Sequence, residues 1–158
     1  MSILIAYASR HGFTKKCAEI LAKKLDGNAD ICDLGSNKPD LSKYDKVIVG
    51  GSVYIGKILK STARFCAANL DTLKVKKLGL FICGMAGEND AMAQLEANFP
   101  KELLAAAAAK GAFGGEFSFD NMNPLERFMI KKISGSDANQ SCLREDNITS
   151  FAERMKKA

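Results

Sequence analysis

The segment Ser9–Thr14 combines residue types that suit a phosphate group. It has a hydroxyl side chain at each end and a glycine, Gly12, in between, and it joins an apolar run of strand length to a helical pattern. Backbone N–H groups converge at such a turn, and the positive end of the following helix favours an anion. The segment therefore predicts a phosphate site, while a second interpretation is that Ser9 and Thr14 only cap the helix.

A second candidate segment, Ser52–Gly56, follows another buried apolar run. Two glycines five residues apart are followed by Lys57, which is close to a nucleotide P-loop, but Ile58 stands where that motif needs a magnesium-binding Ser or Thr. The centre of the segment, around Tyr54, is large and apolar where a loop is usually polar. This favours a flat aromatic ligand over a triphosphate. The alternative is that Tyr54 simply covers the edge of the core.

A third segment, residues 83–89, is small and glycine-rich, so that the backbone at Gly84 and Met85 can approach a ligand. Cys83 is either a reactive or a structural thiol, and the absence of a neighbouring His or basic residue in the sequence favours the structural thiol. His11 is the only histidine and there is no Gly-x-Ser-x-Gly motif, so triad hydrolysis is not expected. The five cysteines lack a Cys-x-x-Cys pair, and no catalytic residue or metal site is predicted.

The elements that must position these segments alternate between strands and helices along the whole chain. This alternation predicts an α/β fold with a doubly wound, five-stranded parallel sheet, in which ligands bind beyond the carboxyl ends of the strands. The run of alanines at 105–109 is expected to be helical, because alanine is the best helix former, and Gly111 is expected to end that helix. The expected strands are 2–8, 29–34, 46–51, 78–84 and 112–119, and the expected helices are 13–25, 59–70, 88–98, 101–110 and 148–155.

Composition agrees with one globular domain over residues 1–158. The chain is 47% apolar and 26% charged, and its net charge of +5 is spread among acidic residues without an aromatic-basic motif, which argues against nucleic-acid binding. Neither a membrane-spanning run nor a signal peptide is evident in the sequence, so we expect a cytoplasmic protein.

The phosphate and aromatic segments together resemble the flavodoxin family. The chain is most similar to its menaquinone-dependent protoporphyrinogen oxidase branch, through residues 3–14, 44–52 and 127–132. The resemblance implies FMN as cofactor and a sheet of order 2-1-3-4-5, with helices on both faces. The residues that it assigns to FMN are Ser9, Arg10, His11, Gly12, Phe13 and Thr14 around the phosphate, Ser52, Val53, Tyr54, Ile55 and Gly56 beside the flavin, and Gly84 and Met85 as a third contact.

The function expected from this resemblance is electron transfer through bound FMN, with a redox protein or a quinone as partner. An alternative is an enzyme that resembles protoporphyrinogen oxidase and passes electrons to a quinone, and a third possibility is an interaction module that has lost FMN. Residues 124–133 have a basic amphipathic pattern that predicts either peripheral membrane contact or a helix packed on the sheet. The residues expected at the membrane are Leu125, Phe128, Lys131 and Lys132.

Overall fold

The computed structural model describes residues 2–27, 29–117 and 140–158. The expected amphipathic segment 124–133 lies outside these residues. In chain order the elements are β1 (Ile3–Ala8), α1 (Phe13–Lys24), β2 (Ala29–Asp33), the 3-10 turn η1 (Leu41–Lys43), β3 (Lys46–Tyr54), β4 (Lys57–Ile58), α2 (Lys60–Ala68), α3 (Leu70–Leu73), β5 (Lys77–Cys83), α4 (Glu88–Asn98), α5 (Lys101–Ala106), β6 (Ala107–Ala112), β7 (Gly114–Phe117), β8 (Gln140–Leu143) and α7 (Glu145–Lys157).

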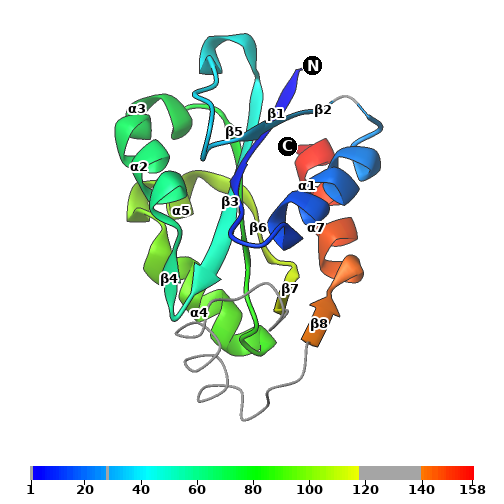
Figure 1. Cartoon of the computed structure of the whole chain (residues 1–158). Helices are drawn as coiled ribbons and strands as arrows, with labels where there is room; N and C mark the ends of the chain where they lie inside the picture. Colours follow the sequence, from blue (N-terminus) through cyan, green and yellow to red (C-terminus); the bar gives the residue numbers. More distant parts are fainter. Residues whose placement is uncertain (1, 28, 118–139) are drawn as a thin grey trace.

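A parallel sheet in the order β2-β1-β3-β5-β6 forms the centre of the molecule (Figure 1). The predicted order 2-1-3-4-5 is confirmed, because β5 and β6 are the fourth and fifth parallel strands. Helices α1 and α7 cover one face of the sheet, and α2, α3, α4 and α5 cover the other. The short strand β4 pairs antiparallel with the end of β3, and β7 and β8 form a separate antiparallel pair.

The prediction for the fifth parallel strand was wrong. The expected helix 101–110 ends at Ala106, and the strand is β6, Ala107–Ala112, instead of 112–119. Tertiary packing overrides the helix propensity of alanine here, because small side chains let β6 lie close beneath the aromatic core. Gly111 lies within this strand, where a Cβ would stand 3.0 Å from Phe113 and 3.2 Å from Phe151.

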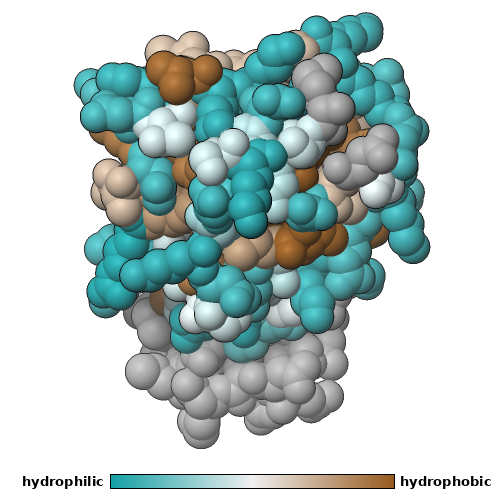
Figure 2. All heavy atoms as spheres, turned by 90° about the horizontal axis from the view of Figure 1, so that it is seen from above, coloured by the Kyte–Doolittle hydropathy of each residue, from teal (hydrophilic) through white to brown (hydrophobic). Residues whose placement is uncertain are grey.

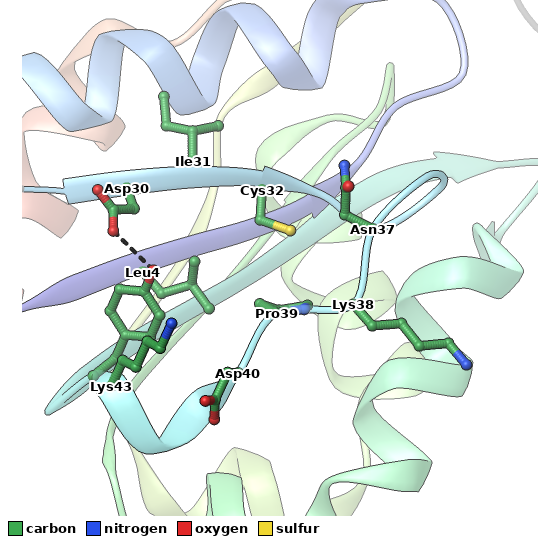
Figure 3. A pocket seen from close by; sticks show the side chains of 10 residues that line it. Leu4, Asp30, Ile31, Cys32, Asn37, Lys38, Pro39, Asp40 and Lys43 are labelled. Carbon is green, nitrogen blue, oxygen red and sulfur yellow. Dashed lines mark hydrogen bonds between the residues drawn. The ribbon is translucent and has the colours of Figure 1, made fainter.

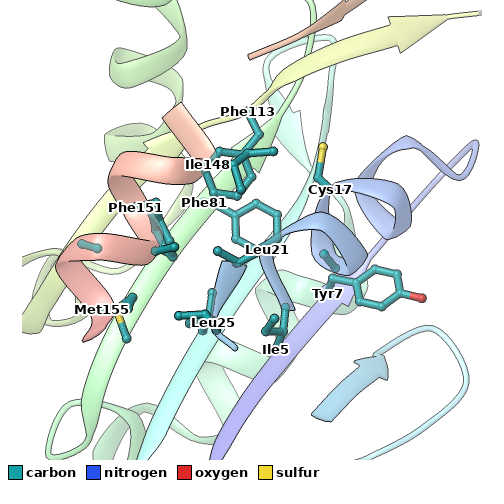
Figure 4. Close-up of a cluster of buried hydrophobic side chains, with 14 of the residues drawn as sticks. Ile5, Tyr7, Cys17, Leu21, Leu25, Phe81, Phe113, Ile148, Phe151 and Met155 are labelled. Atoms are coloured by element: carbon teal, nitrogen blue, oxygen red, sulfur yellow. The ribbon is translucent and has the colours of Figure 1, made fainter. Parts of the chain in front are cut away.

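The hydrophobic core on the α1 and α7 face is built around three phenylalanines (Figure 4). The rings of Phe81 and Phe113 are stacked with centroids 4.6 Å apart, and the ring of Phe151 meets both of them edge-on. All three side chains are fully buried. Space for the rings comes from glycine in the neighbouring strand, since a side chain at Gly50 would overlap the Phe81 ring.

The C-terminal helix is fixed to the amino end of the sheet by one buried lysine. The Nζ of Lys46, at the start of β3, donates a hydrogen bond of 2.6 Å to the carbonyl of Met155 near the end of α7. A cation at the last turn of a helix is favourable because the unsatisfied carbonyls there carry partial negative charge. Burial, followed by the charge of Lys77, lowers the pKa of Lys46.

The molecule seen from above presents a largely hydrophilic surface with scattered hydrophobic residues (Figure 2). A helix that crosses a bilayer needs about 20 apolar residues. No helix within the described ranges is long and apolar enough to do so.

We expect Gly79→Ala to lower the free energy of unfolding by about 1–3 kcal/mol, because overpacking forces neighbours to shift. A Cβ on Gly79 would stand 2.7 Å from Phe151 and 2.9 Å from the sulfur of Met155. The matched control is Gly87→Ala, which meets no atom within 4 Å and should change stability by less than about 0.5 kcal/mol. Urea unfolding of both variants measures the difference, and equal midpoints would contradict this account of the core.

Candidate functional site

The register of the parallel strands brings the three candidate segments to one edge of the sheet. Ala8 at the end of β1 is level with Gly51 in β3, and Ser52 is level with Cys83 at the end of β5. Strands β1, β3 and β5 are neighbours, so the segments that leave their carboxyl ends lie side by side. The strand order implied by the resemblance to flavodoxins predicted this juxtaposition.

The segment Ser9–Thr14 forms a tight turn into α1. Gly12 has φ +90°, a left-handed conformation that glycine adopts readily, and its N–H donates to Ser9 Oγ over 2.9 Å. No side chain caps the start of α1, and its first turn contains no acidic residue. The interpretation of Ser9 and Thr14 as simple helix caps therefore does not hold, and the positive end of the helix faces outward without a carboxylate nearby in the turn.

Two hydroxyls, one buried and one half-buried, join this turn to β3. Thr14 is fully buried, and its Oγ1 lies 2.7 Å from Ser52 Oγ, which also accepts a longer bond of 3.4 Å from the backbone N–H of Arg10. Thr14 and Ser52 thus hold the two segments together beneath the surface. Of the predicted phosphate-binding residues, Arg10, His11 and Gly12 are exposed, Ser9 is half-buried, and Phe13 and Thr14 are buried.

The thiol of Cys83 lies close to the contact between Thr14 and Ser52, within hydrogen-bond reach of Thr14. Its pKa is raised well above the usual value, first by burial and then by the hydrogen bond and charge of Cys17, while a hydrogen bond with Thr14 has the opposite effect. The thiol keeps its proton at neutral pH and is 3% exposed, so both features favour the structural interpretation.

The expected loop Ser52–Gly56 is partly strand. Strand β3 continues to Tyr54, and a two-residue turn of Ile55 and Gly56 leads back into β4. Both turn residues have positive φ, +52° and +77°, the combination found in tight hairpins whose twist matches the strands. Positive φ is unfavourable for a β-branched side chain, so the backbone at Ile55 is strained.

The strained hairpin is held by Asn98, which the sequence analysis did not single out. Its Oδ1 accepts the N–H of Ile58 over 3.0 Å, and its Nδ2 donates to the carbonyl of Gly56 over 3.1 Å. Asn98 is the last residue of α4, 40 positions from Ile58 in the chain, and no local pattern signals such a contact.

A stacked pair connects the phosphate segment to the aromatic one. The guanidinium carbon of Arg10 lies 4.2 Å from the centroid of the Tyr54 ring, a cation–π geometry. Tyr54 is half-buried. Tyr54 therefore does more than cover the edge of the core, because its ring also contacts the guanidinium of Arg10 in the neighbouring turn.

The backbone of the third segment packs closely against the backbone of β7 at Gly84. The N–H of Gly84 donates to the carbonyl of Gly114 over 2.8 Å, and a Cβ on Gly115 would stand 2.5 Å from the Gly84 backbone. The side chain of Met85 is 39% exposed, and Ile55 on the neighbouring hairpin is 43% exposed. Two large apolar side chains are therefore accessible at this edge.

A separate cleft of about 280 Å³ lies beside β2, between that strand and the loop that leads to η1 (Figure 3). Tyr44 closes one end through a 2.8 Å hydrogen bond from its hydroxyl to Asp30. The side chains of Cys32 and Asp30 face the loop, and the cleft contains none of the predicted flavin-contact residues.

The family model described as "Flavodoxin domain" matches residues 4–142. The chain belongs to the flavodoxin domain family. The match to this family covers the three segments of the candidate site and, apart from Ile3, all five strands of the parallel sheet.

Solved flavodoxins share the fold at low sequence identity. A two-electron reduced flavodoxin from Megasphaera elsdenii has a TM-score of 0.58 and 16% identity, with 99% of each chain covered. A Fusobacterium nucleatum flavodoxin bound to flavin mononucleotide has a TM-score of 0.56 and 12% identity, covering 99% of this chain and 97% of that one. A flavodiiron core from Synechocystis has a TM-score of 0.60 and 17% identity, and there the alignment covers 99% of this chain but only 36% of the longer one. No curated protein sequence matches the chain.

We expect Thr14→Val and Ser52→Ala each to lower the free energy of unfolding by about 1 kcal/mol, because each removes the partly buried hydrogen bond between the two hydroxyls. The double variant should lose less than the sum, with a coupling of about 0.5–1.5 kcal/mol. Thr149→Val, which removes an exposed hydroxyl on α7, serves as the remote control and should add to Thr14→Val within about 0.5 kcal/mol. If the changes in the free energy of unfolding caused by Thr14→Val and Ser52→Ala are strictly additive in the double variant, as measured by chemical denaturation, this hydrogen bond does not stabilise the contact between the two segments.

Proposed function

We propose that this flavodoxin domain binds FMN at the edge formed by the ends of β1, β3 and β5 and transfers electrons between partners. The observation that carries the proposal is the start of α1, where a left-handed Gly12 precedes a first turn that has no side-chain cap and no acid. Such a helix start is an anion site. Its place in a flavodoxin domain makes the FMN phosphate the ligand that fits it best.

The residues present fit the phosphate end of FMN. The first hydrogen bond within α1 runs from Lys16 N–H to the Gly12 carbonyl, so the N–H groups of Phe13, Thr14 and Lys15 have no acceptor inside the helix. Lys15 and Lys16 place positive charge in the first turn, where it is unfavourable for an isolated helix and favourable beside a phosphate. The buried side chain of Thr14 would hold the turn against β3, and its backbone N–H would be the group that contacts the phosphate.

The groups proposed to contact the flavin ring are aromatic or apolar, unlike those at the phosphate. Tyr54 offers an aromatic ring, and Ile55 and Met85 offer exposed apolar side chains on the two neighbouring segments. Gly84 and Met85 follow β5, the strand next to β3, and are the proposed third contact. When bound, FMN supplies the electron-accepting and electron-donating chemistry, and the chain orients it and sets its surroundings.

The electron carrier is preferred to the oxidase-like enzyme. Residues 127–132, on which the similarity to the protoporphyrinogen oxidase branch depends most, lie outside the described residues. What supports the carrier is that the three segments proposed to contact FMN leave the neighbouring carboxyl ends of β1, β3 and β5. The proposed contacts remain those of Ser9–Thr14, Ser52–Gly56, Gly84 and Met85.

FMN should bind the apoprotein at least tenfold more tightly than riboflavin, because each charge-assisted N–H bond to the phosphate contributes about 1.5–3 kcal/mol before desolvation is subtracted. Fluorescence titration of both flavins into the apoprotein measures the difference. Inorganic phosphate is the control, since it should weaken FMN binding and leave riboflavin binding unchanged. Equal affinities for the two flavins would remove the phosphate assignment at α1.

Tyr54→Ala should weaken binding of oxidised FMN by about 1–3 kcal/mol, a value typical of aromatic stacking on a flat ring. It should also raise the reduction potential, because an electron-rich ring disfavours the extra negative charge of reduced flavin. Tyr54→Phe is the matched control, because it keeps the ring and should keep the affinity. Titration and spectroelectrochemistry that detect no change in Tyr54→Ala would place this residue away from the flavin.

A further inference from the structure

Two segments that flank the proposed flavin site are rich in basic residues and contain no acidic residue at all. Neither residues 9–18 nor residues 46–70 include an Asp or Glu. The only lysine of these segments that is withdrawn from the surface is Lys46, which is buried at the opposite end of β3. The remaining cations are exposed and make up what we call the basic edge: Arg10, Lys15, Lys16, Lys57, Lys60 and Arg64.

The basic edge borders the place where electrons would enter or leave, on its β1 and β3 sides. Its members come from the turn into α1, from the β3–β4 hairpin and from the first two turns of α2, all near the carboxyl ends of β1 and β3 (Figure 1). Ile55, in the turn of the hairpin two residues before Lys57, is 43% exposed. An exposed apolar side chain bordered by like charges is the arrangement of a docking surface with a polar rim.

Carboxylates at this end of the molecule lie to either side of the basic edge. Asp33 ends β2, on the outer side of β1, and its Oδ1 accepts the N–H of Gly35. On the β6 side, Glu145 begins α7 and pairs with Lys24 over 3.4 Å, and Asp146 follows it. On the β5 side, the exposed Asp90 lies in the first turn of α4. The positive charge is therefore gathered on the β1 and β3 segments of the proposed site, with carboxylates on either flank.

We propose that the basic edge docks an electron-transfer protein whose own redox centre is ringed by carboxylates. This inference rests on the proposed function, because it names the partner class of the same site. Complementary charge steers two proteins together and aligns their centres without requiring a large apolar contact. An anionic membrane fits less well, since the described part of the edge exposes only Ile55 and Met85 as large apolar anchors. A single-stranded nucleic acid would need further accessible aromatic rings, because Tyr54 has Arg10 against it and is already assigned to the flavin.

The test uses the FMN-loaded protein and a plant-type [2Fe–2S] ferredoxin, an acidic one-electron carrier, as the probe. Two reduced ferredoxins give one electron each to one oxidised FMN, which takes its protons from solvent. The second-order rate in stopped flow should fall as ionic strength rises, because salt screens the attraction. Lys57→Glu/Lys60→Glu/Arg64→Glu should lower the rate at low salt at least tenfold.

A control variant with the same change in net charge keeps the test specific. Lys23→Glu/Lys74→Glu/Lys77→Glu alters three exposed lysines at the amino end of the sheet and should change the rate less than twofold. The flavin absorbance of both variants reports that FMN is retained. A rate independent of salt, or an equal loss in both variants, would overturn the proposal.

Failure of the proposed function is distinguishable from failure of the docking surface. If the protein takes up no FMN, salt-dependent binding of ferredoxin to the apoprotein, measured by surface plasmon resonance, still tests the basic edge. Binding that the edge variant abolishes and the control variant retains would support it. Phosphatidylserine vesicles and single-stranded RNA are the competing probes, and edge-dependent binding of either one without ferredoxin binding would overturn the choice of a protein partner.

Discussion

The hydrogen bond between the Thr14 and Ser52 hydroxyls joins the two segments on which the candidate site depends. One belongs to the turn after β1 and the other to the last part of β3, so the bond fixes the start of α1 relative to the hairpin. It can form only because the parallel register places the ends of these two strands level. The position of Arg10 over Tyr54 follows from the same constraint, since the N–H of Arg10 also reaches Ser52.

The register in turn depends on glycines that let aromatic rings lie directly on the sheet. Gly50 and Gly79 leave the space taken by Phe81 and Phe151, and Gly111 does so in β6. A glycine in a strand interior costs conformational entropy, and close packing of a ring against the backbone offsets that cost. Because the rings of Phe81, Phe113 and Phe151 contact one another, the strands they cover are held as one unit.

Elements with a strong local signal were predictable, and those decided by distant contacts were not. The continuous apolar runs of β1, β3 and β5 and the helical stripe of α1 are visible in the sequence, and the resemblance to flavodoxins supplied the strand order that shows which loops meet. The alanines of β6 favour a helix locally, and only the aromatic cover above Gly111 shows why they form a strand. Similarly, the turn type at Ile55 and the bonds from Asn98 depend on a partner far away in the chain.

Two of the places where local rules fail lie in the candidate site. The start of α1 has lysines where acids would stabilise it, and Ile55 occupies a backbone conformation that β-branched residues avoid. Neither feature improves the folded chain by itself, so the rest of the structure must compensate for both, through Asn98 at the hairpin and Ser52 at the turn. A bound phosphate would reverse the unfavourable charge at α1, because the same lysines and N–H groups would then face an anion. Binding of an anion should therefore raise the free energy of unfolding, since the anion offsets the unfavourable interaction of the lysines with the positive end of the helix.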